Sequence, residues 1–306
     1  MKEKPSILVV GSINMDLVLK ISRVPRGGES SIGESYQYIP GGKGANQAVA
    51  AARLGADVTF AGKLGADANG AVLAESLKKG GIATEFLDVS QDAQSGLAVI
   101  LLEDSGQNRI LVYPGANMEI QLEDVQRAFT KSYDAVMLQL EIPEEIVLET
   151  CRLAKERAIP VILDAGPAQD FPLEKAMGLE ILSPNETETL ALTGIEVHTP
   201  EDAERAAQIL QERSQAPYIV LKMGEHGAYL YHEGKLERFP GYKVRAVDTT
   251  AAGDAFTAGM VEKFIRCGDI REAIRYANAV GALTVTRLGA QPSLPTAQEV
   301  QDFILS

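Results

Sequence analysis

The chain has 306 residues, near the upper limit for a single hydrophobic core, and 45% of them are hydrophobic and 23% charged. Its 29 Lys and Arg residues against 42 Asp and Glu residues give a formal net charge of −13. This charge argues against a nucleic-acid partner, because nothing basic offsets the charge of the phosphates. We predict one main domain over residues 1–306 together with a small lid.

The two cysteines, Cys151 and Cys267, both fall in helical apolar patterns. We expect both to be buried free thiols in a reducing compartment. The first apolar run, SILVV, is too short for the core of a signal peptide, and no run approaches the length of a membrane span. We therefore expect a cytoplasmic protein with no membrane partner.

Apolar runs typical of strands alternate with helical patterns through most of the chain. Several runs are apolar throughout, as in a parallel sheet that is covered on both faces. This alternation predicts an α/β fold, a doubly wound, mostly parallel sheet with helices on both faces. The expected strands are 6–10, 57–62, 135–140, 160–164, 179–183 and 218–224. The expected helices are 44–56, 69–81, 143–158, 199–213, 252–266, 269–286 and 296–305.

Two segments interrupt this alternation, residues 14–40 and 95–114. Both contain short alternating runs and turn residues, which is typical of antiparallel hairpins. We expect them to meet as a small antiparallel β lid over a cleft. The alternative is that they are edge strands of the main sheet.

The stretch DTTAAGDAFTAG, residues 248–259, leads from an extended segment into an apolar helical stripe. Ala251, Ala252 and Gly253 therefore lie at a helix N-terminus, where small residues leave backbone N–H groups free to bind an anion. Asp254 falls in the first turn. One interpretation is a carboxylate that stabilises the helix start; the other is a base that accepts the proton of an alcohol attacking a bound phosphate.

A second glycine-rich loop occupies residues 38–55. Gly41, Gly42 and Gly44 leave the backbone bare before a helix, and Lys43 and Asn46 supply donors. The chain contains neither GxxxxGK[ST] nor GxGxxG. We therefore expect this loop to contact a substrate rather than nucleotide phosphates; a purely structural turn is the alternative.

Polar side chains also follow two of the predicted strands. Asn14 and Asp16 come after the first strand, and their donor and acceptor groups suit the vicinal hydroxyls of a sugar. The alternative for this pair is an Asx turn. Glu141 ends another strand and either binds a hydroxyl or simply precedes the helix that starts near Pro143.

Two further loops offer weaker signals. Asn185 and Glu188 are one helical turn apart and could order the water shell of Mg²⁺, or form a solvated helix start. Gly224 and Gly227 bracket a turn between two strands, which fits a hairpin or a cover over a nucleotide. We interpret all three histidines as surface residues, since their spacing suggests neither a metal site nor a triad: His198, His226 and His232.

The stretches GGKGANQAVAAARLG and DTTAAGDAFTAG resemble the two signatures of PfkB-type carbohydrate kinases. The resemblance runs from GSINMD to GAQPSLP, and three stretches favour the ribokinase branch of that family: GSINMD, GGKGANQA and GAQPS. It implies a kinase domain over 1–306 with a lid formed by 14–40 and 95–114. It also implies ATP-dependent phosphorylation of D-ribose at the 5-hydroxyl, which would give ribose 5-phosphate and ADP.

The resemblance assigns a role to individual residues. Asp254 would be the catalytic base, and the anion hole would consist of the amides of Ala251, Ala252 and Gly253. The sugar would be held by Asn14, Asp16, Gly42, Lys43, Asn46, Glu141 and Asp254. ATP would be held by Asn185, Lys222, Gly224, Gly227, Gly253 and Asn278.

The resemblance also implies ions and a partner. Mg²⁺ would be linked to Asn185 and Glu188. K⁺ would bind at Asp248, Thr250, Thr284, Arg287, Gly289 and Ser293, partly through carbonyls. A homodimer through the lid sheet is implied as well. Three positions depart from the commonest family pattern, Ala252, Met223 and Asn278; the last two leave contacts of the nucleotide in doubt.

Other substrates and another class of protein remain as alternatives at this point. A kinase of 2-deoxyribose, of another free sugar or of a nucleoside is possible within the same family. A sugar phosphate would need more basic residues than Lys43. A non-catalytic sugar-binding protein is the third alternative, and the intact stretch around Asp254 counts against it.

Overall fold

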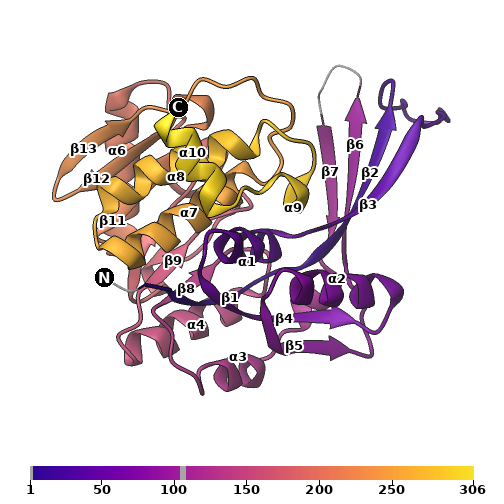
Figure 1. Ribbon diagram of the computed structural model, residues 1–306, viewed down its shortest axis with the longest axis horizontal. Coiled ribbons are helices and arrows are strands. Elements are labelled where there is room, and N and C mark those ends of the chain that lie inside the picture. The colour runs from indigo at the N-terminus through magenta and orange to yellow at the C-terminus, as the bar shows by residue number, and fades with distance from the viewer. Residues whose placement is uncertain (1–2, 104–107) are drawn as a thin grey trace.

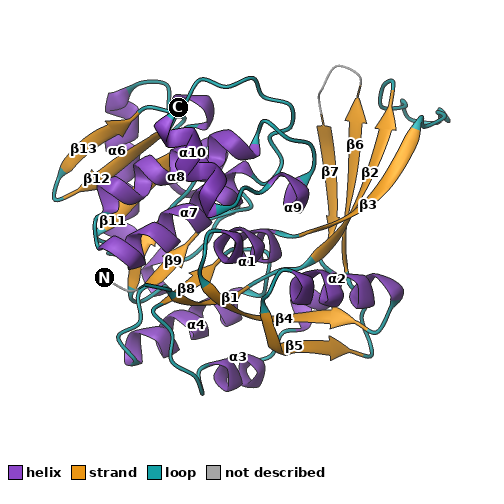
Figure 2. Ribbon diagram, in the orientation of Figure 1, coloured by secondary structure: helices purple, strands orange, loops and turns teal. Residues whose placement is uncertain are grey.

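The structure, a computed structural model, describes residues 3–103 and 108–306. Its largest element is a nine-stranded sheet, parallel from β11 to β5, with β12 and β13 as an antiparallel edge (Figures 1 and 2). The strands in sheet order are β13 (Lys235–Phe239), β12 (Ala228–His232), β11 (Tyr218–Lys222), β10 (Leu179–Leu182), β9 (Val161–Leu163), β8 (Ala135–Leu138), β1 (Ser6–Val10), β4 (Asp57–Gly65) and β5 (Ala83–Ser90).

Helices cover both faces of this sheet (Figure 2). In chain order they are α1 (Lys43–Arg53), α2 (Ala68–Lys79), α3 (Leu122–Ala128), α4 (Glu144–Glu156), α5 (Glu186–Thr193), α6 (Pro200–Ser214), α7 (Ala252–Cys267), α8 (Ile270–Thr284), α9 (Ala290–Ser293) and α10 (Ala297–Leu305). Short 3₁₀ turns lie at η1 (Gly115–Glu119), η2 (Leu173–Lys175) and η3 (Gly224–His226).

Strand β1 shows why the predicted runs are apolar throughout. Ile7 and Val9 belong to the hydrophobic cluster that includes α1, α7 and α8, whereas Leu8 and Val10 belong to the cluster that includes α3, α4 and α6. Successive side chains of a strand point to opposite faces, so a strand covered on both sides must be apolar at every position. Complete burial of each such side chain contributes roughly 1.5–3 kcal/mol. The doubly wound α/β fold is confirmed.

The two interrupting segments form a sheet of their own, with the order β3-β2-β6-β7. Its strands are β2 (Asn14–Ile21), β3 (Ser35–Gly41), β6 (Gly96–Glu103) and β7 (Asn108–Tyr113). Each segment supplies one antiparallel pair, and β2 joins β6 in parallel. The interpretation as edge strands of the main sheet is therefore wrong. Residues 104–107 of the predicted segment 95–114 lie outside the described residues.

This four-stranded sheet stands at one side of the main body, next to α2 and α9 (Figure 1). Asn14 is the first residue of β2 and pairs with Gly41 on β3 and with Gly96 on β6. The base of the sheet therefore joins the main body at the residues predicted to bind a sugar.

Most predicted elements are present with shifted ends. The strand predicted over 218–224 ends at Lys222, because Gly224 has φ 50° and begins the turn η3. Strand β5 and helix α3 were not predicted; β5 alternates only weakly between buried and half-buried positions. Cys151 is buried, but Cys267 is only half-buried because it is the last residue of α7.

The histidines differ from one another. His198 and His226 are exposed as predicted. His232 is half-buried instead, because it ends a sheet strand, its ring stacks against Tyr218, and its Nδ1 lies 2.9 Å from the carbonyl oxygen of Pro217. None of the described helices is long and apolar enough to span a membrane.

Candidate active site

The predicted site residues gather at one edge of the main sheet. Carboxyl ends of parallel strands share an edge, and ligands of open α/β sheets bind there. Lys222 ends β11, Asp164 directly follows β9, and Glu141 lies three residues beyond β8. Helices α1 and α7 begin at the same edge and bring Asn46 and Asp254 to it, as the hydrogen bond between these two side chains shows.

Asp254 lies in the first turn of α7 and is only 6% exposed. Its carboxylate accepts hydrogen bonds from Asn46 Nδ2 at 2.9 Å and from Gln47 Nε2 at 3.3 Å. Burial raises the pKa of Asp254 to about 6, from 3.8, against the opposing effect of Lys43. A carboxyl group with this pKa is ionised at neutral pH and can accept a proton there.

The N-terminus of α7 is formed by Ala251, which has the left-handed φ of 61° that is uncommon for a residue other than glycine. The amides of Ala251 and Gly253 donate to no other group within the described chain. A Cβ atom built on Gly253 would meet only the Lys222 Nζ, at 3.8 Å. These two amides are therefore open to an anion, which also gains from the helix dipole.

The third expected amide behaves differently. Because the left-handed residue turns the chain back, the amide of Ala252 donates to the carbonyl of Thr249 at 3.2 Å and closes a turn. The cradle of three free amides is thus reduced to two in this conformation, Ala251 and Gly253.

Asn14 and Asp16 lie on β2 and are 3% and 7% exposed. Asn14 Oδ1 accepts a hydrogen bond from Asn117 Nδ2 at 2.7 Å. Burial, with smaller contributions from Glu141 and Asp254, raises the pKa of Asp16 to about 7. Gly41 makes room for this carboxylate, because a Cβ there would lie 2.1 Å from Asp16 Oδ2.

The start of α1 faces the same space. Gly42 has φ 89° and backs onto Ile13 and Asn14, so that a Cβ there would lie 2.7 Å from the Asn14 amide nitrogen. The next residue, Lys43, donates its amide to Glu141 Oε2 at 3.2 Å, and Ser12 Oγ donates to the same oxygen at 2.5 Å.

Lys43 carries the positive charge of this group. Burial alone would lower the pKa of its ammonium, but the surrounding carboxylates, led by Asp254, raise the pKa by more. Lys43 therefore stays protonated among several acidic side chains.

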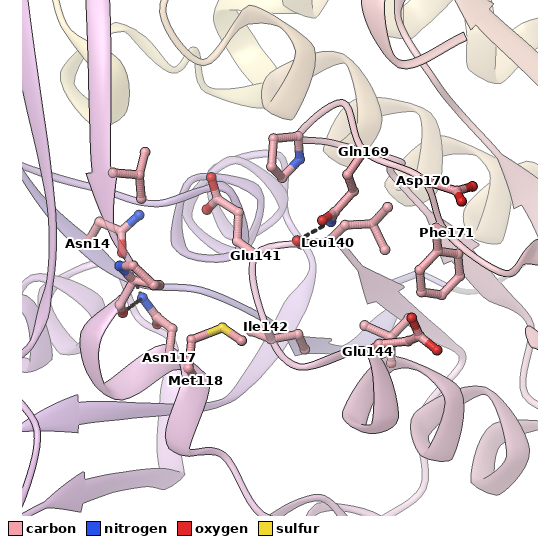
Figure 3. A pocket seen from close by; sticks show the side chains of 14 residues that line it. Asn14, Asn117, Met118, Leu140, Glu141, Ile142, Glu144, Gln169, Asp170 and Phe171 are labelled. Atoms are coloured by element: carbon pink, nitrogen blue, oxygen red, sulfur yellow. Dashed lines mark hydrogen bonds between the residues drawn. The ribbon is translucent and has the colours of Figure 1, made fainter. Parts of the chain in front are cut away.

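A cavity of about 360 Å³ begins at Asn14 and Glu141 (Figure 3). It continues between Ile142 and Leu140 toward Phe171. A second cavity, of about 470 Å³, lies between the inner face of the small sheet and the loop at 246–250, and includes Asp16. Of the predicted sugar residues, Asn14 and Glu141 line the first cavity and Asp16 lines the second, whereas the rest line neither of these two: Gly42, Lys43, Asn46 and Asp254.

The predicted nucleotide residues converge on a third cavity of about 710 Å³. Its lining includes five of the six, namely Lys222, Gly224, Gly227, Gly253 and Asn278. The sixth, Asn185, pairs with Lys222 in an isolated parallel bridge. Asn278 Nδ2 also donates to the carbonyls of Phe239 and Pro240, so this side chain holds the loop that borders the cavity.

Asn185 and Glu188 form a capping box at the start of α5. Asn185 Oδ1 accepts from the Glu188 amide at 2.9 Å, and Glu188 Oε2 accepts from the Asn185 amide at 2.8 Å. Amide and carboxylate oxygens of this kind suit the water shell of Mg²⁺, and the six direct ligands of the ion would then be water and phosphate oxygens. No group of three or more His, Cys, Asp and Glu side chains in the described chain is arranged to hold a metal ion.

Part of the predicted K⁺ set is assembled around Asp248. Its Oδ1 accepts from the Thr250 amide and hydroxyl at 2.9 and 2.6 Å, and its Oδ2 accepts from the Gly289 amide at 2.8 Å. The remaining side chains turn to other partners. Thr284 and Ser293 donate to carbonyls of their own helices, and Arg287 pairs with Glu299 at 2.6 Å.

Besides Ser12, Asn117 and Gln139, which donate to Glu141, Asn14 and Gln47, three buried polar side chains around Asp254 were not predicted: Asp164, Gln47 and Thr257. All three belong to one hydrogen-bond network that reaches Asp254. Asp164 carried the only available signal, since it directly follows an apolar strand as Glu141 does. Gln47 and Thr257 lie inside helices, where nothing in their spacing marks them.

Comparison with known proteins matches residues 4–297 to the pfkB family carbohydrate kinase model. The chain is 36% identical over 303 residues to a ribokinase of Haemophilus influenzae, covering 98% of this chain and 99% of that one. It is 33% identical over 301 residues to a deoxyribokinase of Salmonella typhi, with 97% and 98% covered. The solved structure of Arabidopsis thaliana ribokinase complexed with ribose and ATP superposes with a TM-score of 0.89 at 35% identity, covering 98% of this chain and 99% of that chain. The chain belongs to the pfkB family of carbohydrate kinases.

Proposed function

We propose that this protein transfers the γ-phosphoryl group of ATP to the 5-hydroxyl of D-ribose, giving ribose 5-phosphate and ADP. One observation carries the proposal. The buried carboxylate of Asp254 lies at the N-terminus of α7, between the nucleotide cavity, which Gly253 lines, and the predicted sugar residue Asn46, which donates to it. The ribokinases among the relatives, one of them solved with ribose and ATP, favour ribose as the substrate.

In the proposed reaction the 5-hydroxyl oxygen bonds to the γ-phosphorus, and the bond from that phosphorus to the bridging oxygen of ADP breaks. The hydroxyl proton passes to Asp254. The amides of Ala251 and Gly253, which donate to no other group in the described chain, would donate to the oxygens of the transferred group. In a loose phosphoryl-transfer transition state, positioning and charge neutralisation supply most of the rate, so a base with a pKa near 6 is sufficient.

The sugar would be held on the opposite side of Asp254. Asp16 and Asn14 offer acceptors to vicinal hydroxyls, and Lys43 and Asn46 offer donors. Gly42 and Glu141 would border the sugar on the same side, because the amide of Lys43, the residue after Gly42, donates to the Glu141 carboxylate. We infer that the four-stranded sheet, built from 14–40 and 95–114, serves as the lid over this side.

The nucleotide would occupy the 710 Å³ cavity, with its phosphates toward Gly253 and Lys222. Mg²⁺ bound with the nucleotide would neutralise phosphate charge, and Asn185 and Glu188 would hold its waters. K⁺ would bind around Asp248, Thr250 and Gly289, assisted by carbonyl or hydroxyl oxygens of Thr284, Arg287 and Ser293. This loop precedes the anion hole directly, so a cation there would stabilise the hole without touching the sugar.

A homodimer through the lid sheet is part of the proposal. Four large apolar side chains on one face of the sheet expose half or more of their surface: Tyr36, Tyr38, Leu111 and Tyr113. Exposed patches of this kind mark protein interfaces. Light scattering should therefore give the wild type twice the chain mass of 32.8 kDa. Leu111→Lys should give a monomer, and Val72→Lys, at a similarly exposed residue of α2, should stay dimeric. A monomeric wild type contradicts the dimer.

The two raised pKa values predict the pH dependence of catalysis. Asp254, with a pKa of about 6, must be ionised to accept the proton, and Asp16, with a pKa of about 7, must be ionised to accept hydroxyl donors. The ionised forms of both carboxyl groups are lost as pH falls. The logarithm of kcat/KM for the sugar should therefore be constant above about pH 8 and approach a slope of two below about pH 6. Asp16→Asn should reduce that slope to one. A profile that is flat down to pH 5 would show that neither carboxyl titrates as described.

The experiment that tests the function is a coupled assay of ADP release with Mg²⁺, across ribose, 2-deoxyribose, fructose and a nucleoside, each with and without K⁺. Ribose should give the highest kcat/KM, and K⁺ should increase it. A preference for 2-deoxyribose would contradict ribose as the substrate and favour the alternative, a kinase of 2-deoxyribose like the Salmonella relative. No sugar-dependent ADP release with any of them contradicts a kinase.

A further inference from the structure

A chain of buried side chains connects the proposed base to a lysine on another strand. Asp164, fully buried after β9, accepts hydrogen bonds from Lys222 Nζ at 2.9 Å, Gln47 Nε2 at 3.0 Å and Thr257 Oγ1 at 2.9 Å. The same Gln47 nitrogen donates to Asp254 Oδ1 at 3.3 Å. The network therefore runs from Lys222 through Asp164 and Gln47 to Asp254.

The orientation of Gln47 in this network is fixed from its other end. Its Oε1 accepts a hydrogen bond from Gln139 Nε2 at 2.6 Å, and Gln47 is 0% exposed. A flipped amide would point its oxygen at two carboxylates and its NH₂ group at another NH₂ group. Both Nε2 hydrogens are thus directed at Asp164 and Asp254, one to each, and the separation of the two carboxylates is set by a single amide group.

Asp164 also joins the elements that carry the reacting groups. Gln47 lies on α1, which supplies Lys43 and Asn46; Lys222 ends β11. Thr257 lies on α7 one turn after Asp254, so its bond to Asp164 holds the helix that bears the base. Hydrogen bonds to a charged, buried acceptor are the stronger kind and have directional preference.

Lys222 stands at the other end of the network, beside the mouth of α7. Its Nζ would lie 3.8 Å from a Cβ on Gly253, whose amide is open, and it lines the nucleotide cavity. Glu188 Oε2 lies 4.0 Å from the same nitrogen. The ammonium is therefore held between two carboxylates next to the place where a transferred phosphoryl group would sit.

We propose that Asp164 is a positioning residue. It orients the carboxylate of Asp254 through Gln47 and Thr257, and it holds the Lys222 ammonium at the N-terminus of α7. This inference rests on the proposed function. One buried carboxylate, that of Asp164, would then fix the positions of two groups beside the transferred phosphoryl group: the proton acceptor Asp254 and the ammonium of Lys222. Asp164 itself is fully buried and lines none of the three cavities described above.

Gln47→Met tests the link to Asp254, because it removes the amide hydrogens with little change of size and no change of charge. A misplaced base should lower kcat about 10- to 100-fold. KM for the sugar should stay nearly unchanged, because the variant removes positioning in the transition state rather than a contact with the bound sugar. Loss of a donor to the carboxylate should also raise the pKa of Asp254, so the acid limb of kcat/KM should move to higher pH. The charged groups around Asp254, namely Lys43, Asp16, Glu141 and Asp164, all remain in this variant.

Thr257→Val supplies an independent test with a matched control. Thr257 and Thr150 are both fully buried helical threonines, but the Thr150 hydroxyl donates only to the Ile146 carbonyl of its own helix. Thr257→Val should lower kcat several-fold and move the acid limb in the same direction as Gln47→Met. Thr150→Val should leave kcat and the pH profile unchanged even if the melting temperature falls equally.

The outcomes separate this inference from the proposed function. An active wild type together with unchanged kcat and an unmoved acid limb in folded Gln47→Met or Thr257→Val overturns the role of Asp164 and leaves the kinase assignment intact. A wild type that phosphorylates no sugar overturns the function, and the inference with it. If Gln47→Met fails to fold, Thr257→Val decides.

Discussion

Replacing Asp254 with Asn should lower kcat about 10²- to 10⁴-fold, the usual contribution of a positioned general base, while the affinity for the sugar stays nearly unchanged. The amide cannot accept the hydroxyl proton, but it keeps the size of the carboxylate. Asn46 can still form a hydrogen bond with the new amide. If its side chain rotates, its Oδ1, which is buried without a partner among the described residues, can accept from the new NH₂ group. Sugar binding is measured by calorimetry and turnover by ADP release.

Asp269→Asn is the matched control for this variant. Asp269 caps α8 as an exposed acid at a helix N-terminus, and Asn is an equally good cap, so kcat and stability should stay at the wild-type level. Near-normal turnover of Asp254→Asn would refute the role of the base. Loss of both sugar binding and turnover would show instead that Asp254 serves mainly to bind the sugar.

Lys222→Met should reduce the free energy of unfolding by about 3–5 kcal/mol, because it leaves a buried carboxylate without its partner. The Lys222 side chain is 9% exposed and that of Asp164 is not exposed at all. Burial alone would raise the pKa of Asp164, but the lysines Lys222 and Lys43 lower it below the usual range. The charge at this position is therefore stabilised chiefly by the cation that the variant removes. Urea unfolding measures the change.

The control for Lys222→Met is an exposed pair. Lys79 and Glu75 form an i,i+4 pair on α2 with side chains 76% and 58% exposed, so Lys79→Met should change stability by less than about 0.5 kcal/mol. Adding Asp164→Asn to Lys222→Met should recover part of the loss, because the unpaired charge is then absent. A loss under about 1 kcal/mol for the single variant, or no recovery in the double one, would mean that the buried pair is not the stabilising unit described.

The sequence allowed the fold and the ends of the network to be predicted, for clear physical reasons. Strand β1 is apolar at all four of its buried positions, Ile7 to Val10, because both of its faces are covered, which indicates a doubly wound sheet from one chain segment. Asp254 was found because bare residues at a helix start are a local pattern. Asn14, Asp16 and Glu141 follow strands, and the carboxyl edge of a parallel sheet brings such residues together.

The connecting residues were missed because their partners are distant in sequence. Gln47 and Asp164 are 117 positions apart, and no periodicity predicts that two carboxylates share one glutamine. The hydrogen bond from the Ala252 amide to Thr249 was not predicted either, since it follows from the left-handed backbone of Ala251 rather than from residue size. The parallel pairing of β2 with β6 depends in the same way on packing between segments more than seventy residues apart, as the partners Asn14 and Gly96 illustrate.

The identity of the product tests the proposed chemistry most directly. Wild-type protein incubated with ribose, ATP, Mg²⁺ and K⁺ should yield one ADP for each ribose converted, and phosphorus and proton NMR should locate the new phosphate on the C5 oxygen. ADP formed without a sugar phosphate, or a phosphate attached to another hydroxyl, would contradict a base and an anion hole that meet at the 5-hydroxyl.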